Sequence, residues 1–65
     1  MGFRSARINA GKKVTEVMEH MGVSDAAVYF WEDGTTHPTI DKLVKLAKFY
    51  GVTVEELLTP DSEEE

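Results

Sequence analysis

Basic side chains near the start of the chain have the clearest capacity to bind another molecule. Arg4, Arg7, Lys12 and Lys13 lie within the first fifteen residues, which contain no acidic residue. Clustered positive charge attracts anions such as phosphate groups. A second basic group follows later in the chain: Lys42, Lys45 and Lys48. Because this later group covers only part of one helical face, we interpret it as a solvated face, the alternative being a second anion-binding surface. In the first group, Lys12 and Lys13 are the candidates for binding an anion.

The net charge of the chain disfavours an anionic partner, but the distribution of the charged residues changes this interpretation. The net charge is −5, with 12 acidic and 7 basic residues, which by itself disfavours a polyanionic partner. Four of the acidic residues, however, fall within residues 61–65. Acidic ends of this kind are usually solvated, and they can also mask a basic face. We therefore expect an acidic, flexible tail at residues 60–65 that follows a single domain at residues 1–59.

No group of side chains in the sequence suggests catalysis. There is neither a Ser-His-Asp pattern nor a Gly-rich phosphate loop, and 65 residues are few for a deep, enclosed pocket. The absence of cysteine excludes disulfides and thiolate chemistry. The two histidines, His20 and His37, lie far apart in sequence and indicate no metal site. We expect a protein that is not an enzyme and that uses neither a cofactor nor a metal.

The apolar residues likewise give no sign of a membrane or an export signal. The longest apolar run falls far short of the ~20 residues that cross a bilayer. No apolar segment follows Arg4 at the N-terminus, as it would in a secretory signal. The sequence therefore predicts a cytoplasmic protein with no membrane association.

Short helices must position the side chains described above. Glycines divide the chain into pieces of roughly ten residues, each with helical periodicity. The expected helices span residues 3–10, 14–21, 25–33, 39–50 and 53–58. Their inward residues are Phe3, Ala6, Ala10, Val14, Val17, Met18, Met21, Ile40, Leu43, Val44, Leu46, Ala47, Tyr50, Val54, Leu57 and Leu58. Helices of this length are unstable alone, so the sequence predicts an all-α fold of five helices around one core.

The segments 14–21 and 25–33 are joined by Met21-Gly22-Val23-Ser24. Gly22 permits the left-handed conformation of a sharp turn, and the Ser24 hydroxyl can cap the following helix. Two short helices joined by such a turn are the sequence form of a helix-turn-helix. The sequence therefore predicts this motif at the second and third helices.

The second helix of this motif has two contrasting faces. At about 100° per residue, one arc carries Ala27, Val28 and Trp31, and Trp31 is expected in the core. The opposite arc carries Asp25, Ala26, Tyr29 and Phe30. An exposed arc with two aromatic residues favours a surface for a partner molecule, the alternative being packing against another part of the same chain.

Several short fragments spread over residues 3–58 are specific in combination. They are Gly22-Val23-Ser24, Ala27-Val28, Trp31-Glu32-Asp33-Gly34, Pro38, Leu43, Leu46-Ala47 and the run from Tyr50 to Leu58. Together they resemble the phage-repressor (Cro-like, xenobiotic-response-element) helix-turn-helix family. The resemblance implies a compact, five-helix, lambda-repressor-like domain that binds double-stranded DNA with its third helix in the major groove.

The resemblance also implies roles for individual residues. Contacts to DNA bases are expected from Asp25, Ala26, Tyr29 and Phe30. Contacts to DNA phosphates are expected from Lys12, Lys13, Val14, Thr35, Thr36 and His37. Arg7 and Glu32 match a structural ion pair between the first and third helices. Because one such module touches few base pairs, we expect a homodimer on two half-sites, with its contact near the fifth helix and the chain end.

This chain departs from the family pattern at several of these positions. Relatives often carry Gln where this chain has Val14, and a Thr or Ser cap where it has Lys13. None of the four base-facing residues is basic or an amide. Met18 stands where relatives usually have Ala at the helix crossing. These departures remove the strongest base-reading side chains, so specificity must come from weaker contacts and from DNA shape.

The sequence as a whole predicts a sequence-specific, repressor-like DNA-binding transcriptional regulator of bacterial or phage origin. The alternative is a protein-interaction module on the same fold, with Tyr29 and Phe30 as the contact surface. Net acidity and the missing basic readers favour that alternative. Both hypotheses use the same arc of the third helix.

Overall fold

The computed structural model describes residues 1–59 and forms five α helices with no strand in that range. The predicted acidic tail and Pro60, expected to end the last helix, lie outside the described residues. The helices are α1 (Phe3–Asn9), α2 (Val14–Met21), α3 (Asp25–Asp33), α4 (Ile40–Tyr50) and α5 (Val54–Leu58). The predicted all-α, five-helix architecture is confirmed. None of these helices is long and apolar enough to cross a membrane.

Three helices, α3, α4 and α5, begin where the sequence offers a side-chain cap. The Ser24 hydroxyl accepts a hydrogen bond from the Ala27 amide at 3.3 Å, and the Thr39 hydroxyl accepts one from the Lys42 amide at 3.4 Å. Thr53 and Glu56 form a reciprocal capping box at the start of α5. Each cap satisfies a backbone amide that the first helical turn leaves free. The predicted Ser24 cap of α3 is therefore confirmed, and α4 and α5 begin one residue after the expected positions 39 and 53, which hold their caps.

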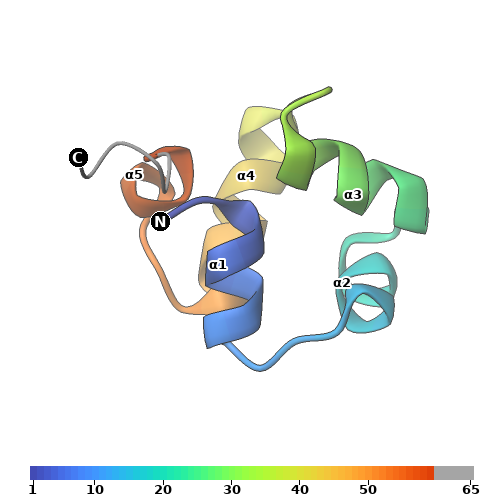
Figure 1. Cartoon of the computed structure of the whole chain (residues 1–65), viewed down its shortest axis with the longest axis horizontal. Helices are drawn as coiled ribbons and strands as arrows, with labels where there is room; N and C mark the ends of the chain where they lie inside the picture. The colour runs from blue at the N-terminus through green and yellow to red at the C-terminus, as the bar shows by residue number, and fades with distance from the viewer. Residues whose placement is uncertain (60–65) are drawn as a thin grey trace.

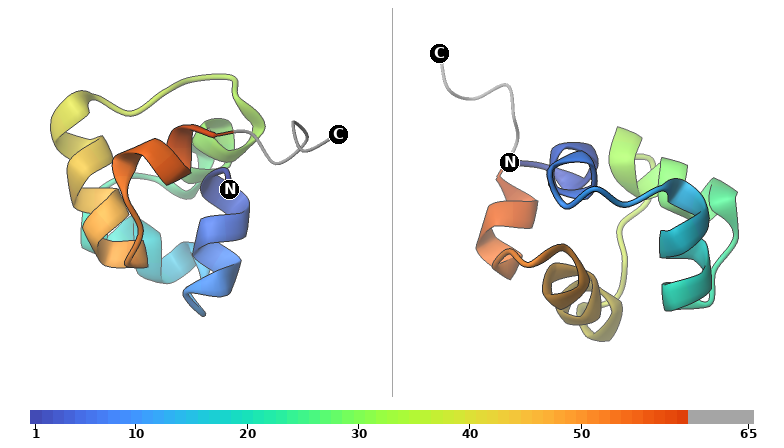
Figure 2. Two further views of the ribbon diagram at one scale, coloured as in Figure 1. Left: turned by 90° about the vertical axis from the view of Figure 1, so that its left-hand side faces the viewer. Right: turned by 90° about the horizontal axis from the view of Figure 1, so that it is seen from below.

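The helices surround one apolar core, and α2 and α3 lie side by side at one end of the molecule (Figures 1 and 2). The buried residues are Ala6, Val17, Met21, Val28, Trp31, Leu43, Leu46, Ala47, Tyr50 and Leu57. Phe3, Ala10, Val14, Met18 and Val54 pack partly buried against them. The N-terminal ammonium donates to the carbonyl oxygens of Glu56 and Thr59, at 3.0 and 2.8 Å. The first residue is thereby held against the end of α5.

Three residues expected in the core are exposed. Ile40 is 72% exposed, and Val44 and Leu58 also face solvent. On α4 the buried face is centred between Leu43 and Tyr50, and at about 100° per residue Ile40 and Val44 fall on its edge. Leu58 follows the fully buried Leu57 and is turned about 100° away from it. The prediction that these three side chains point inward is wrong, because each core-facing arc is narrower than its apolar stripe.

Candidate nucleic-acid interface

Helices α2 and α3 pack against each other and are joined by a tight turn. Gly22 adopts the left-handed conformation, with φ 70°, and its amide donates to the Met18 carbonyl oxygen at 2.8 Å. A residue with a side chain is strained at such a φ. The turn then reaches the Ser24 cap of α3. The predicted helix-turn-helix at residues 14–33 is confirmed, and its inner face is anchored in the core by Val17 and Trp31.

The outer face of α3 presents an exposed arc of Asp25, Ala26, Tyr29 and Phe30, which we call the α3 arc. All four residues are exposed, with 48% of Tyr29 and 44% of Phe30 accessible to solvent. Val28, on the opposite side of the helix, is buried. The aromatic residues of the α3 arc therefore do not pack against another part of the chain within residues 1–59, which was the alternative expectation.

Asp33 belongs to the same exposed side of α3, one turn beyond Tyr29, and sequence reasoning missed it. Its Oδ1 atom accepts hydrogen bonds from the Thr35 hydroxyl at 2.6 Å and the Thr35 amide at 2.9 Å. These two bonds, the hydroxyl first, hold the pKa of the Asp33 carboxyl below its usual value. The helical wheel alone predicts its exposure, at about 80° from Asp25. The outer side of α3 therefore carries two carboxylates.

The loop after α3 uses several of its own donors within the chain. The Thr35 amide and hydroxyl both donate to Asp33, and the Thr36 amide donates to the Phe30 carbonyl oxygen at 3.3 Å. The Thr36 side chain has no such partner within residues 1–59. Phosphate contacts from Thr35 and Thr36 remain a prediction. The Thr35 hydroxyl already donates to Asp33, whereas the Thr36 hydroxyl has no hydrogen-bond partner within residues 1–59.

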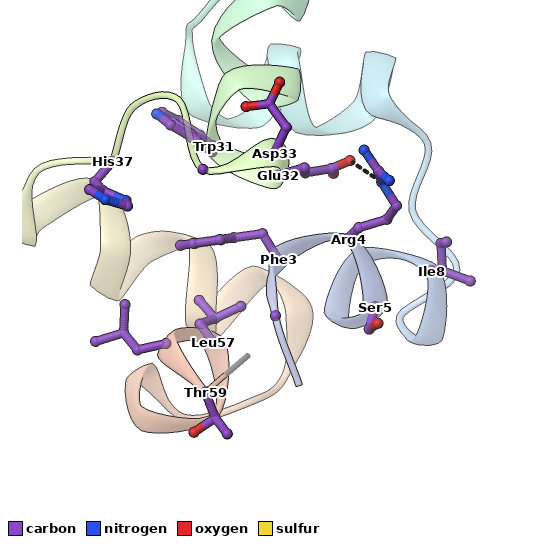
Figure 3. A pocket seen from close by; sticks show the side chains of 13 residues that line it. Phe3, Arg4, Ser5, Ile8, Trp31, Glu32, Asp33, His37, Leu57 and Thr59 are labelled. Carbon is purple, nitrogen blue, oxygen red and sulfur yellow. Dashed lines mark hydrogen bonds and ion pairs between the residues drawn. The ribbon is translucent and has the colours of Figure 1, made fainter. Parts of the chain in front are cut away.

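His37 lies farther along this loop and lines a pocket between α1, α3 and α5 (Figure 3). The pocket measures about 440 Å³, and its apolar wall includes Phe3, Trp31 and Leu57. Figure 3 shows His37 on the same side of the pocket as the ring of Phe3. The sequence placed His37 among the phosphate-binding residues, and that role remains a prediction.

The start of α2 combines two lysines with free backbone amides. The Lys13 side chain has no acceptor atom, and the cap is instead the Glu16 carboxylate, which accepts from the Lys13 amide at 2.7 Å. Within residues 1–59 the amides of Val14 and Thr15 donate to no acceptor of the chain. Free amides and the helix dipole favour an anion at such a position, although the Glu16 carboxylate lies close by. Lys13 is exposed beside them.

Lys12 is held against an aromatic stack that sequence reasoning did not find. Its Nζ atom lies 4.7 Å from the centre of the Phe49 ring, a distance typical of a cation–π contact. Phe49 in turn stacks on His20, with ring centres 4.0 Å apart and planes inclined by 10°. The three residues come from the α1–α2 loop, α2 and α4. No spacing along the chain indicates such a contact, because it depends on how the helices pack.

Arg7 and Glu32 form the ion pair that the sequence analysis expected between α1 and α3. The Arg7 Nε atom donates to Glu32 Oε2 at 2.6 Å, and Arg7 Nη1 donates to the Lys12 carbonyl oxygen at 3.2 Å. Arg4, which sequence reasoning missed, donates to Glu32 Oε1 at 3.2 Å. The Glu32 side chain is only 1% exposed. One buried carboxylate therefore joins two arginines of α1 to α3 and, through Arg7, to the loop before α2.

The ion pair also sets the charges near the helix-turn-helix. The hydrogen bond that Arg7 donates to the Glu32 carboxylate is the main cause that raises the pKa of Arg7. Burial, aided by the Glu32 charge, raises the pKa of the Tyr50 hydroxyl well above its usual value. Both ion pairs within residues 1–59 involve Glu32, and neither involves a lysine. Lys12 and Lys13 therefore keep their charge unpaired by carboxylates within this range.

Two known transcriptional regulators are similar in sequence to this chain. RstR, the transcriptional repressor of the cryptic phage CTXphi from Vibrio cholerae, is 38% identical over 61 residues, covering 94% of this chain and 54% of RstR. The transcriptional activator BcrR of Enterococcus faecalis is 34% identical over 55 residues, covering 82% of this chain and 27% of BcrR. The chain thus spans about half the length of the first relative and about a quarter of the second.

The comparison with known families agrees with the geometry of α2 and α3. Residues 3–57 match the helix-turn-helix family, which covers all but the last residue of the described helices. No solved structure matches the chain significantly. The chain belongs to the phage-repressor (Cro-like) helix-turn-helix family.

Proposed function

We propose that the chain is a sequence-specific DNA-binding transcriptional regulator whose α3 enters the major groove. The main observation behind this proposal is that α3 has one exposed and one buried face. Val28 is buried on one side, and the other side exposes Asp25, Ala26, Tyr29 and Phe30. The major groove, about 12 Å wide, admits an α helix. Family membership and the names of both relatives support a regulator. Since one relative is named a repressor and the other an activator, we assign no direction of regulation.

Affinity would come mainly from phosphates on either side of α3. Lys12, Lys13 and the free amide of Val14 offer charge and donors at the start of α2. On the other side, the loop at residues 35–37 offers the Thr36 hydroxyl and His37. The chain would act by binding and not by catalysis, in the bacterial cytoplasm, in keeping with the sources of the two relatives.

Two copies would bind together on two half-sites about one helical turn apart. A single small module buries too little surface for tight specific binding. We place the contact between the copies near α5, where Leu58 is exposed. The state of the protein on a palindromic duplex, measured by sedimentation, tests this part of the proposal.

Lys13→Ala should weaken binding to a preferred duplex and to a random duplex by similar factors. The lysine would neutralise a phosphate, so its loss should also lower the log–log salt slope of the binding constant by about one. The experiment first selects the preferred site from a random duplex pool and then titrates salt. Lys45→Ala, which removes an equal charge from the exposed face of α4, is the matched control. A loss confined to one sequence, or equal effects of both variants, would contradict the phosphate role of Lys13.

Tyr29→Ala should lower the preference for the selected site more than the affinity for random DNA. Loss of recognition at one base pair typically costs about 1–3 kcal/mol of discrimination. Competition binding between the two duplexes measures the preference directly. Ile8→Ala, an exposed apolar residue of α1, serves as the control for loss of surface area. Equal losses on both duplexes would refute a base-reading role for Tyr29.

A protein-interaction module is the second candidate function, and one observation favours it. The outer side of α3 combines the exposed rings of Tyr29 and Phe30 with the carboxylates of Asp25 and Asp33. Aromatic residues commonly anchor protein interfaces, and carboxylates repel DNA phosphates. A salt slope near zero on duplex DNA, with protein binding that depends on Tyr29 and Phe30, would favour this candidate.

A further inference from the structure

The α3 arc lacks the side chains that read purines. Guanine presents two acceptors, N7 and O6, in the major groove and is read by Arg or Lys, while adenine is read by Asn or Gln. The arc offers a carboxylate, a methyl group, a phenol and a phenyl ring. The two arginines of the chain, Arg4 and Arg7, are both paired with Glu32. Of the arc's side chains, only the Tyr29 hydroxyl can donate a hydrogen bond.

The four side chains form two parallel rows along α3. Residues four apart are neighbours on a helix surface, so Asp25 and Tyr29 form a polar row and Ala26 and Phe30 form an apolar row. All four are exposed. Two residues four apart are separated by about 6 Å along the axis, close to two base steps at about 3.4 Å each. Each row can therefore meet bases within three consecutive base pairs.

We infer that α3 recognises pyrimidines: thymine C5-methyl groups against Ala26 and Phe30, and a cytosine N4 amino group against Asp25. Apolar side chains contact the thymine methyl, and carboxylates accept from cytosine N4. Asp25 makes no ion pair within residues 1–59, so its carboxylate oxygens are available to accept a hydrogen bond. Because a carboxylate is repelled by phosphate, we assign this contact to a base and not to the DNA backbone. This inference rests on the proposed function and specifies the duplex that it requires.

Replacing thymine by deoxyuridine in the selected site tests the apolar row. This exchange removes the C5-methyl group and keeps base pairing. We expect the affinity of the intact protein to fall about fourfold at each contacted thymine, from the loss of one buried methyl group. Deoxyuridine outside the three-base-pair contact should have no effect. For the Phe30→Ala variant, exchanging the thymine that Phe30 contacts for deoxyuridine should no longer lower the affinity fourfold. Circular dichroism verifies that the variant is folded.

The polar row has its own test. Asp25→Asn should move the preference at one position from cytosine toward adenine, since an amide can both accept from N6 and donate to N7. Exchange of guanine for 7-deazaguanine on the strand read by α3 should leave the affinity of the unaltered protein unchanged. A selected site that tolerates deoxyuridine everywhere, or that loses affinity with 7-deazaguanine on that strand, overturns the inference while leaving duplex binding intact. Absence of salt-dependent duplex binding overturns the proposed function itself.

Discussion

Replacing Trp31 with alanine is expected to lower the free energy of unfolding by about 3–5 kcal/mol, because a large buried side chain would leave a cavity. Trp31 is 6% exposed and belongs to the core that holds α3 in place. A domain of this size has a total stability of only about 3–10 kcal/mol. Much of the variant should therefore be unfolded at 37 °C. Urea denaturation followed by circular dichroism measures the change without relying on the lost indole fluorescence.

The preceding residue provides a matched control. Phe30→Ala removes an aromatic ring from the same helix, but that ring is 44% exposed on the α3 arc. We expect its loss to lower the free energy of unfolding by less than about 1 kcal/mol. The two variants thus distinguish the contribution of buried Trp31 to stability from that of the exposed surface of α3. Equal destabilisation by both would mean that the arc packs within the monomer, and the proposed DNA-reading surface would fail with it.

Glu32→Ala should have the second-largest effect, about 2–4 kcal/mol of the free energy of unfolding. The substitution leaves Arg7, whose side chain is only 14% exposed, with a charge that has lost its partner. Removing one partner of a buried, hydrogen-bonded pair costs far more than the pair itself contributes. Thermal unfolding at neutral pH measures the change. DNA binding should weaken on all sequences, because Arg7 also holds the Lys12 carbonyl before α2.

Two controls distinguish this effect from a general loss of charge. Arg4→Ala breaks the other bond to Glu32, but Arg4 is mostly exposed, and an exposed ion pair contributes about 0–1 kcal/mol. Glu19→Ala removes an exposed carboxylate of α2 that makes no ion pair within residues 1–59. We expect both to be close to neutral. If Glu19→Ala destabilised the protein as much as Glu32→Ala, the buried carboxylate would not be the link between α1 and α3.

The helices and the two faces of α3 were predictable from the sequence. Ser24, Thr39 and Thr53 cap helices through bonds to amides three residues away, so their effect depends only on near neighbours in the chain. Gly22 acts through its own backbone angle. The arc of α3 follows from helical periodicity once the buried Trp31 is recognised. The helical wheel also predicts the exposure of Asp33, which lies about 80° from Asp25 on the outer side of α3.

Contacts between helices were decided only by the tertiary structure. Lys12, Phe49 and His20 meet because α4 packs beside α2 and the loop that precedes it. Ile40 has the right spacing for the core and is nevertheless exposed, because the neighbouring helices cover a narrower arc of α4. Residue type and spacing specify a helix and its apolar side, since those depend on local bonds and periodicity. The angle and depth at which helices meet depend on all their side chains at once, and no local pattern contains that information.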